Sequence, residues 1–220
     1  MEIRTDLAME AQILEQPGTL PRGVHMRTET RSGLEATVVE IRSAAGAAAI
    51  GKPRGTYITI ELGQLLHRER DSFDRAAGAI AAWLRELLAL PASLPVLVAG
   101  LGNRDVTPDA VGPLTADHIL VTRHMLREMP RQFGWFRPVS AVIPGVLGTT
   151  GLESAEAVRA FQQKVEAAAV IAVDAIAARD TSRLCSTVQL SNTGIAPGSG
   201  IGNRRAALDR RTLGVPVIAV

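Results

Sequence analysis

Two short apolar runs in this chain each end at a turn that carries an aspartate. Residues 95–100 form the first run and lead through a glycine-rich turn to Asp109, while residues 169–173 lead directly into Asp174. Short apolar runs that are bounded by turn residues are typical of buried strands. If both are parallel strands of one sheet, Asp109 and Asp174 lie at its carboxyl edge, where α/β sheets build their binding and catalytic sites.

The remaining apolar patterns alternate between strand and helix. They predict strands at 34–41, 57–62, 95–100, 139–143, 169–173, 187–190 and 215–220, and helices at 72–90, 113–128 and 154–168. Alternation of this kind predicts an α/β fold with three layers, in which helices cover a largely parallel central sheet. Residues 1–33 are mixed in character and contain a turn-rich stretch at 16–23, so we expect an N-terminal arm followed by a single domain over 34–220.

Composition excludes several classes of protein. The net charge of +2 gives no argument for a nucleic-acid or anionic-membrane partner. Cys185 is the only cysteine, which rules out an intramolecular disulfide, and we expect it in the core. The acidic N-terminus does not have the pattern of a secretory signal, and the longest apolar run is too short to span a bilayer. We therefore expect a cytoplasmic protein without a membrane anchor.

The chemistry that best suits Asp109 and Asp174 is hydrolysis by an activated water. Two carboxylates that lie close together do not both ionise readily, so one keeps a proton and acts as an acid while the other acts as a base. The alternative is that each aspartate only caps the N-terminus of a following helix. Asp105, Asp117 and Glu153 are rival carboxylates, which we expect on the solvated surface.

Other catalytic motifs are weak or missing. The loop at 194–203, followed by Arg204 and Arg205, could surround an anion or a peptide carbonyl with backbone N–H groups, but it matches neither a phosphate loop nor a dinucleotide fingerprint. The four histidines are scattered and lack metal-ligand spacing, and no G-x-S-x-G nucleophile motif occurs. We therefore expect neither a cofactor nor a metal.

Several motifs, taken together, are more specific than any one of them. They are Gly-Leu-Gly-Asn at 100–103, Val-Thr-Pro-Asp-Ala-Val-Gly-Pro at 106–113, Thr-Arg-His at 122–124, Arg-Pro-Val-Ser at 137–140, Pro-Gly-Val at 144–146, Val-Asp-Ala at 173–175, Ala-Ala-Arg at 177–179 and Pro-Gly-Ser-Gly-Ile-Gly-Asn-Arg at 197–204. In order and spacing they resemble the spore germination protease family, which degrades the small acid-soluble proteins that coat DNA in dormant spores.

The resemblance implies an aspartic-type endopeptidase of the spore core with a phosphorylase/hydrolase-like α/β fold, akin to the hydrogenase maturation proteases. Its proposed catalytic aspartates match Asp109 and Asp174. It also implies a self-processing zymogen and a homotetramer or other homo-oligomer. We expect glycine-rich loops to shape the substrate cleft through Gly102, Asn103, Gly145, Gly198, Gly200 and Asn203.

The N-terminal arm acquires a meaning from the same resemblance. Residues 5–10, Thr-Asp-Leu-Ala-Met-Glu, are similar to the acidic-apolar-Ala-x-Glu sequence that the family cuts. Asp6–Leu7 is therefore the expected autoprocessing bond, with residues 1–6 as a short propeptide. The chain departs from the family pattern at Asn192, where members usually carry Asp, and at Ala196, where they carry His. Larger members continue past the equivalent of Val220, so we expect a shorter relative or a truncated chain.

Two alternatives remain open at this stage. In the first, a divalent metal lies between the same carboxylates and activates the water. In the second, the chain is a non-catalytic sporulation protein that binds its partner on this fold. The separation of Asp109 and Asp174 bears on both, because a catalytic dyad needs the two carboxylates in one cleft.

Overall fold

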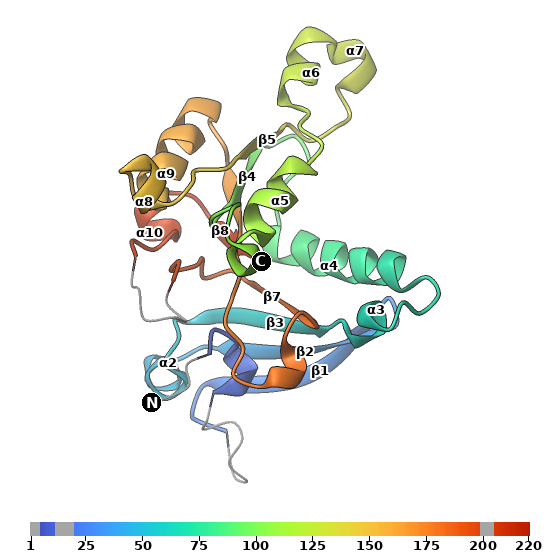
Figure 1. Ribbon diagram of the computed structural model, residues 1–220, viewed down its shortest axis with the longest axis vertical. Coiled ribbons are helices and arrows are strands. Elements are labelled where there is room, and N and C mark those ends of the chain that lie inside the picture. Colours follow the sequence, from blue (N-terminus) through green and yellow to red (C-terminus); the bar gives the residue numbers. More distant parts are fainter. Residues whose placement is uncertain (1–4, 12–19, 199–204) are drawn as a thin grey trace. The chain divides into compact units, whose positions relative to one another are not determined.

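The structure is a computed structural model that describes residues 5–11, 20–198 and 205–220 (Figure 1). The chain forms two compact units. Unit 1 comprises Met1–Leu87 and Ile176–Thr193, and unit 2 comprises Leu88–Ala175 and Gly194–Val220. The sequence had suggested one domain after an arm, because apolar patterns locate strands and helices but do not indicate which of them pack together.

Unit 1 is built on an antiparallel sheet in the order β1 (Val24–Arg31), β2 (Leu34–Ile41), β3 (Gly55–Glu61) and β7 (Thr187–Ser191). Its helical elements are η1 (Ala8–Glu10), α2 (Ala44–Ile50), α3 (Gly63–Leu66), nearly all of α4 (Ser72–Leu88) and η3 (Thr181–Arg183). The expected strands at 34–41 and 57–62 pair directly, with Thr37 opposite Thr59.

Strand β1 lies within the segment that we expected to be an arm. Most of its residues are exposed, because the strand lies at the edge of the sheet, pairs only with β2 and carries charged residues. Apolar alternation is therefore weak, and hydropathy alone does not reveal the strand. The sequence feature that indicates this hairpin is the Ser32–Gly33 pair. Both residues have positive φ in the structure, as a two-residue hairpin turn requires.

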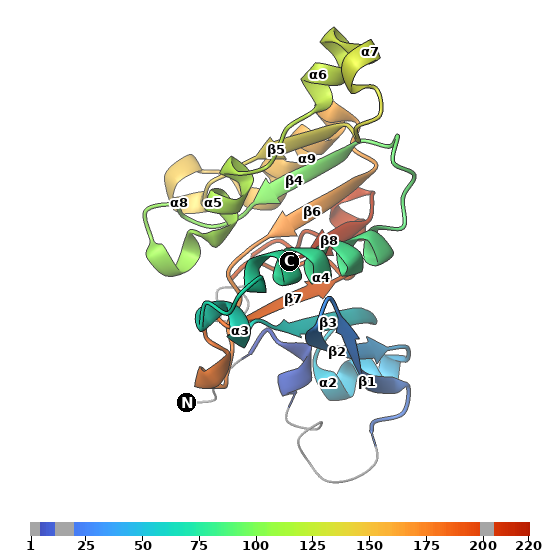
Figure 2. The ribbon, with the colours of Figure 1, turned by 90° about the vertical axis from the view of Figure 1, so that its right-hand side faces the viewer.

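Unit 2 holds a parallel sheet in the order β8 (Val217–Ala219), β6 (Ala169–Val173), β4 (Val96–Gly100) and β5 (Val139–Val142). Figure 2 shows β4, β5 and β6 running in the same direction. Its helical elements are η2 (Thr107–Asp109), α5 (Val111–Asp117), α6 (Arg123–Glu128), α7 (Pro130–Phe133), α8 (Leu147–Thr150), α9 (Ser154–Val165) and α10 (Arg210–Leu213).

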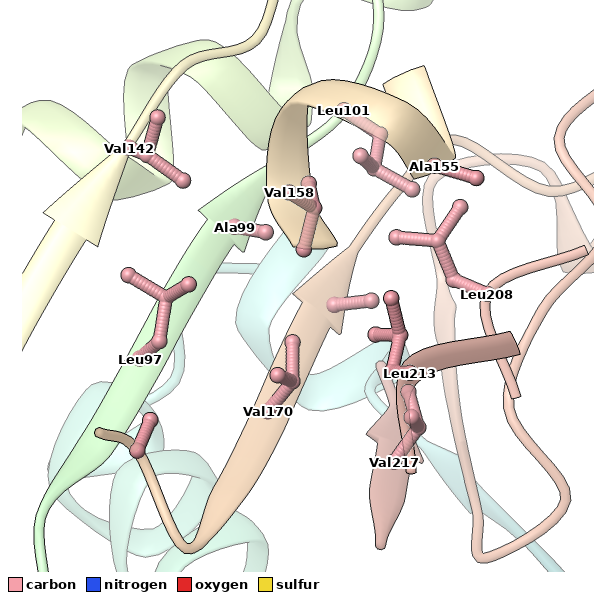
Figure 3. Packing of buried hydrophobic residues seen from close by; sticks show 12 residues of the cluster. Leu97, Ala99, Leu101, Val142, Ala155, Val158, Val170, Leu208, Leu213 and Val217 are labelled. Carbon is pink, nitrogen blue, oxygen red and sulfur yellow. The ribbon is translucent and has the colours of Figure 1, made fainter. Parts of the chain in front are cut away.

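The two faces of this parallel sheet are covered by different helices. Alternate residues of β4 point to opposite faces. Leu97 and Ala99 pack in one buried cluster with Val158 of α9 (Figure 3), whereas Gly100 lies against α5. Unit 2 therefore has helix, sheet and helix layers, and the predicted α/β class with a parallel central sheet is confirmed.

Two local predictions are wrong. The helix expected over 113–128 is broken into α5 and α6, because the chain is drawn towards β5 at Thr122. The Thr122 hydroxyl donates to the Arg137 carbonyl and accepts the Val139 N–H at 2.9 Å, while its own N–H donates to the Val139 carbonyl at 3.0 Å. Cys185, expected in the core, is exposed in the turn before β7.

Candidate active site

The carboxyl ends of β4 and β6 lie side by side in unit 2. Gly100 and Val173 are partners in the register of the two parallel strands. Just beyond them, the N–H of Leu101 donates to the carbonyl of Val173 at 2.8 Å, and the N–H of Asp174 donates to the carbonyl of Val220 at 3.1 Å. The backbone that carries Asp174 is therefore fixed on both sides by neighbouring chain segments.

Two glycines hold the start of α5 against these strand ends. A Cβ added to Gly112 would lie 2.1 Å from the carbonyl oxygen of Leu101, and one added to Gly100 would lie 2.2 Å from that of Gly112. Such distances leave no room for a side chain, so the backbones meet directly. Because Asp109 comes three residues before Gly112, this contact brings Asp109 to the sheet edge where Asp174 lies.

The loop that leads to Asp109 folds back onto its carboxylate. The N–H of Asn103 donates to Asp109 Oδ2 at 2.7 Å. Gly102 has a φ of +111°, and a Cβ there would lie 2.1 Å from the Asp109 carbonyl oxygen and 3.0 Å from its Oδ1. Glycine is thus required at position 102 both for backbone conformation and for space. Gly102 and Asn103, two of the expected cleft residues, lie directly against Asp109.

The helix-capping alternative does not describe either aspartate. Helix α5 has Ala110 at its N-cap and no side-chain cap. The Asp109 carboxylate instead accepts a hydrogen bond from the Asn103 amide. Asp174 accepts the N–H of Ala175 through Oδ1 at 2.9 Å, and residues 175–179 form no helix. Both side chains are half-buried. Their position at the strand ends is therefore not explained by helix capping.

A pocket of about 210 Å³ opens at this edge, and all of its lining residues belong to unit 2. It is lined by Leu101, Gly102, Asp109, Val146, Leu147, Gly148, Glu153, Ser154, Asp174, Pro197, Gly198 and Arg205. The two aspartates that the sequence singled out thus face the same cavity. Such a pocket, with few polar groups that converge in it, is the usual form of a small binding or catalytic site.

Three carboxylates and one cation line the described part of the pocket. The third carboxylate, Glu153, was expected to be a solvated surface acid. It lies at the start of α9, where its N–H donates to Glu156 Oε2 at 3.1 Å, and its carboxylate is 3.6 Å from the Arg205 guanidinium. The sequence feature that indicates a place for Glu153 in the pocket is its position between the loop after β5 and a helix, since such loops lie at the carboxyl edge of the sheet.

The other expected cleft residues and rival carboxylates fall in different places. Gly198 lines the pocket, and Gly145 supports it through its carbonyl, which accepts the Ser154 hydroxyl at 3.0 Å. Gly200 and Asn203 lie outside the described residues. Asp117 is paired with Arg104 at 2.7 Å, and Asp105 is exposed; neither lines the pocket.

The expected processing bond Asp6–Leu7 lies in unit 1 and does not line the pocket. The Leu7 side chain is 1% exposed, and the Asp6 carboxylate accepts the N–H of Ala177 at 2.9 Å. The Gln189 side chain accepts the N–H of Ala8 at 2.8 Å and donates to the carbonyl of Asp6 at 3.0 Å. Asn192, a departure from the family pattern, also lies in unit 1, where its Oδ1 accepts the Thr56 N–H at 2.9 Å. An asparagine oxygen makes this contact as a carboxylate would.

Two other kinds of site are absent from the described part of the chain. No three side chains of His, Cys, Asp or Glu converge there as a set of metal ligands. None of the described helices combines the length and apolar character that a membrane span requires.

Comparison with known proteins identifies the family. Residues 2–220 match the family of germination proteases. The chain belongs to the germination protease family. The germination protease of Caldanaerobacter subterraneus is 49% identical over 219 residues, covering 99% of this chain and 67% of that protein. Those of Clostridium perfringens and Priestia megaterium are 40% and 39% identical, with 99% of this chain aligned to 68% and 62% of their lengths.

Membership in the germination protease family confirms the resemblance carried by the motifs. It makes this chain a peptidase of a family that acts in spore germination. The chain spans about two thirds of the length of these relatives.

Proposed function

We propose that this germination protease is an aspartic-type endopeptidase that degrades small acid-soluble spore proteins, with water activated between Asp109 and Asp174. The observation that carries the proposal is the pair of half-buried carboxylates in one pocket at the ends of two paired strands. Glycines at 100, 102 and 112 leave space for backbone only, which supports a rigid site.

The reaction needs one carboxylate ionised and the other protonated. The ionised carboxylate takes a proton from water while the oxygen of that water bonds to the scissile carbonyl carbon. The protonated carboxyl donates its proton to the carbonyl oxygen. Collapse of this intermediate breaks the C–N bond. The departing nitrogen takes the proton that the first carboxyl received from water, and the second carboxylate recovers its proton from a hydroxyl of the intermediate, which restores both aspartates.

Self-processing at Asp6–Leu7 is part of the same proposal. Because Leu7 is buried in unit 1, we infer that the segment must leave its site before the bond can be cut. N-terminal sequencing under activating conditions would then detect a chain that starts at Leu7. If the N-terminus stays intact while substrate is degraded, self-processing at this bond is wrong.

We also propose that the protein acts in the spore core as a homo-oligomer, without direct binding to nucleic acid or membrane. Light scattering at several protein concentrations measures the oligomeric state independently of activity. A monomer at all concentrations would contradict this part of the proposal without touching the chemistry of the pocket.

The deciding experiment replaces each aspartate by its isosteric amide. Asp109→Asn and Asp174→Asn are each expected to reduce cleavage of a small acid-soluble spore protein at least 10³-fold, because an amide neither takes up nor donates the proton that the step requires. Asp105→Asn is the matched control, since Asp105 is exposed and outside the pocket. Full activity in either pocket variant would exclude the dyad, and a stable complex with uncut substrate in the unmodified chain would favour a binding protein.

A further inference from the structure

A second surface of unit 2 lies apart from the candidate active site. We call it the projection: residues 118–138, which link α5 to β5 and contain α6 and α7. Figures 1 and 2 both show α6 and α7 extending beyond the parallel sheet. Neither helix contains a buried residue, and the two pack chiefly on each other. The side chains of the projection are therefore presented mainly to solvent.

Hydrogen bonds at its base fix the projection to the rest of unit 2. The Thr122 hydroxyl joins the two sides of the base, because it donates to the Arg137 carbonyl and accepts the N–H of Val139. The Arg137 guanidinium donates to the carbonyl oxygens of Leu94 at 2.8 Å and Leu90 at 3.1 Å. A surface that is held in this way loses less conformational freedom on binding than a free loop does.

Large apolar side chains are exposed on the projection. The Trp135 side chain is 75% exposed, and its ring stacks on the ring of Phe136 with 3.9 Å between the centroids. Leu120, Val121 and Met129 are each more than a third exposed. Single exposed apolar residues are common, but a group of them on one short segment is typical of a surface that another molecule covers.

The projection also concentrates positive charge. It holds four arginines and one glutamate, which give a formal charge of +3, whereas the whole chain carries +2. Arg123, Arg127 and Arg131 form no ion pair with any other described residue, and the last two are exposed. The modest charge of the chain thus conceals a strongly cationic surface.

These residue types favour a protein partner. Arginine, tryptophan and methionine are enriched at protein interfaces, where arginine and tryptophan contribute much of the binding energy. A DNA backbone would satisfy the guanidinium groups but would leave Leu120 and Met129 without apolar contacts. Two copies of the projection that face each other would bring like charges together. The complementary surface is therefore a different one, which combines carboxylates with apolar side chains.

The projection and the pocket lie at opposite ends of β5. The projection leads into Val139, the first residue of β5, whereas the loop after Val142 reaches Val146 in the pocket. No residue of the projection is among the described residues that line the pocket. A partner on the projection therefore does not occupy the pocket.

We propose that the projection docks a partner protein through an acidic segment that carries large apolar side chains. The carboxylates of the segment pair with Arg127 and Arg131, and its apolar side chains cover Trp135. The proposal does not rest on the catalytic role of Asp109 and Asp174, because the described parts of the two sites share no residue.

The test measures binding of the labelled synthetic peptide Glu-Glu-Leu-Glu-Glu-Phe-Glu-Glu by fluorescence anisotropy. One control peptide carries Gln for every Glu, and the other carries Ala for Leu and Phe. The protein is the full chain with Asp174→Asn, so that the peptide stays uncut, and mass spectrometry of the peptide checks this. With unlabelled peptide, tryptophan emission reports where the peptide binds, because Trp135 is exposed and the other tryptophan, Trp83, is fully buried.

We expect the acidic apolar peptide to bind at least tenfold more tightly than either control peptide. It should also shift the emission of Trp135 to shorter wavelength, because the indole is removed from water. Trp135→Ala should weaken binding at least tenfold, whereas Phe161→Ala, which removes an exposed aromatic side chain from α9, should not. Equal binding of the three peptides, or equal binding by these two variants, would overturn the proposal.

The contribution of charge is tested separately. Arg127→Gln combined with Arg131→Gln should weaken binding at least tenfold and reduce its dependence on salt concentration. The matched control combines Arg85→Gln with Arg159→Gln, which remove two exposed arginines from α4 and α9 and should leave binding unchanged. If the two double variants bind the peptide equally, the proposed charge contacts are wrong.

Two further measurements cover the other classes of partner. Duplex DNA that binds through Arg127 and Arg131, without binding of the acidic peptide, would replace the protein partner by a nucleic acid. A smaller oligomer of Trp135→Ala in light scattering would assign the projection to contacts between copies of this chain.

Hydrogen exchange covers the case in which a variant does not fold. The chain without changes in the projection is mixed with the acidic apolar peptide at saturating concentration, and the amides of residues 118–138 are followed. We expect their protection to increase, while the Gln control peptide leaves it unchanged. Protection that does not respond to the acidic peptide would also overturn the proposal.

Discussion

The α-carbon of Gly112 faces the carbonyl of Val173 so closely that an added Cβ would lie 2.5 Å from the oxygen. The same Cβ would lie 2.1 Å from the carbonyl oxygen of Leu101, so one residue of α5 rests on the ends of both β4 and β6. The position of Asp109 relative to Asp174 is therefore set by backbone contacts, which are less variable than contacts between side chains. A preorganised pair of this kind is what water activation requires.

Gly102 is predicted to be important for cleavage because it lies directly against Asp109. Gly102→Ala places a methyl group against Asp109 and strains a positive φ, so we expect cleavage to fall at least 100-fold, mainly in kcat, because the carboxylate is displaced. The control is Gly51→Ala, which has the same kind of positive φ but nothing within 4 Å of the added Cβ. It should cost about 1 kcal/mol of unfolding free energy and leave cleavage intact. Equal activity of the two variants would contradict this role.

The N-terminal segment, residues 5–10, is predicted to undock in acid. Burial alone raises the pKa of the Glu10 carboxyl, but hydrogen bonds from Thr5, the Arg179 and Asp180 amides and Arg183 outweigh burial and hold the pKa below its ordinary value. A lowered pKa means that Glu10 stabilises the docked segment above the ordinary glutamate pKa, about 4.3, and that this stability is lost as pH falls further. Exchange protection of the Asp6 and Ala8 amides should therefore decrease below that pH.

Glu10→Gln tests the source of this acid sensitivity. Around the carboxylate lie Arg183, Asp180, Thr5 and the backbone amide of Arg179, and Lys52 acts on the same segment through Asp6. The amide variant should show weak protection at neutral pH and little further loss in acid. Glu128→Gln, at an exposed position in unit 2, should behave like the unmodified chain. Acid loss that persists in Glu10→Gln would assign the effect to another group.

Chelation distinguishes the two ways in which these carboxylates can activate water. If Asp109 and Asp174 act as acid and base, prolonged treatment with EDTA should leave the rate of substrate cleavage within twofold. Loss of activity that is restored by a divalent cation would instead support a metal between the carboxylates. The comparison uses the same protein before and after dialysis, with unfolding measured in parallel to exclude a change in stability.

Where backbone pattern decides the position of a residue, the sequence indicated which side chains lie close together. Two apolar runs that end at Gly100 and Val173 were enough to place Asp109 and Asp174 near one sheet edge, because the ends of parallel strands share that edge. Glu153 was undervalued because its approach to the pocket depends on how α9 packs. Hydropathy gives no information on such convergence of distant residues.

Strand β1 and the contacts that hold residues 5–10 were missed for a different reason. An exposed edge strand needs no apolar alternation, and its hairpin turn was the only local signal. The carboxylates of Asp6 and Glu10 accept backbone N–H groups of Ala177 and Arg179, and any sequence possesses such groups. Their role depends on the tertiary fold that brings them to the segment, so residue types alone did not reveal it.

The contact between Asp6 and Gln189 has a consequence for the growing chain on the ribosome. The two residues are 183 positions apart, so at ordinary rates of translation roughly 10 to 40 seconds pass between the synthesis of one and of the other. Throughout that interval Leu7 and Ala8 have no Gln189 to bind them. Binding of Leu7 and Ala8 in their observed positions can therefore begin only after Gln189 has been synthesised.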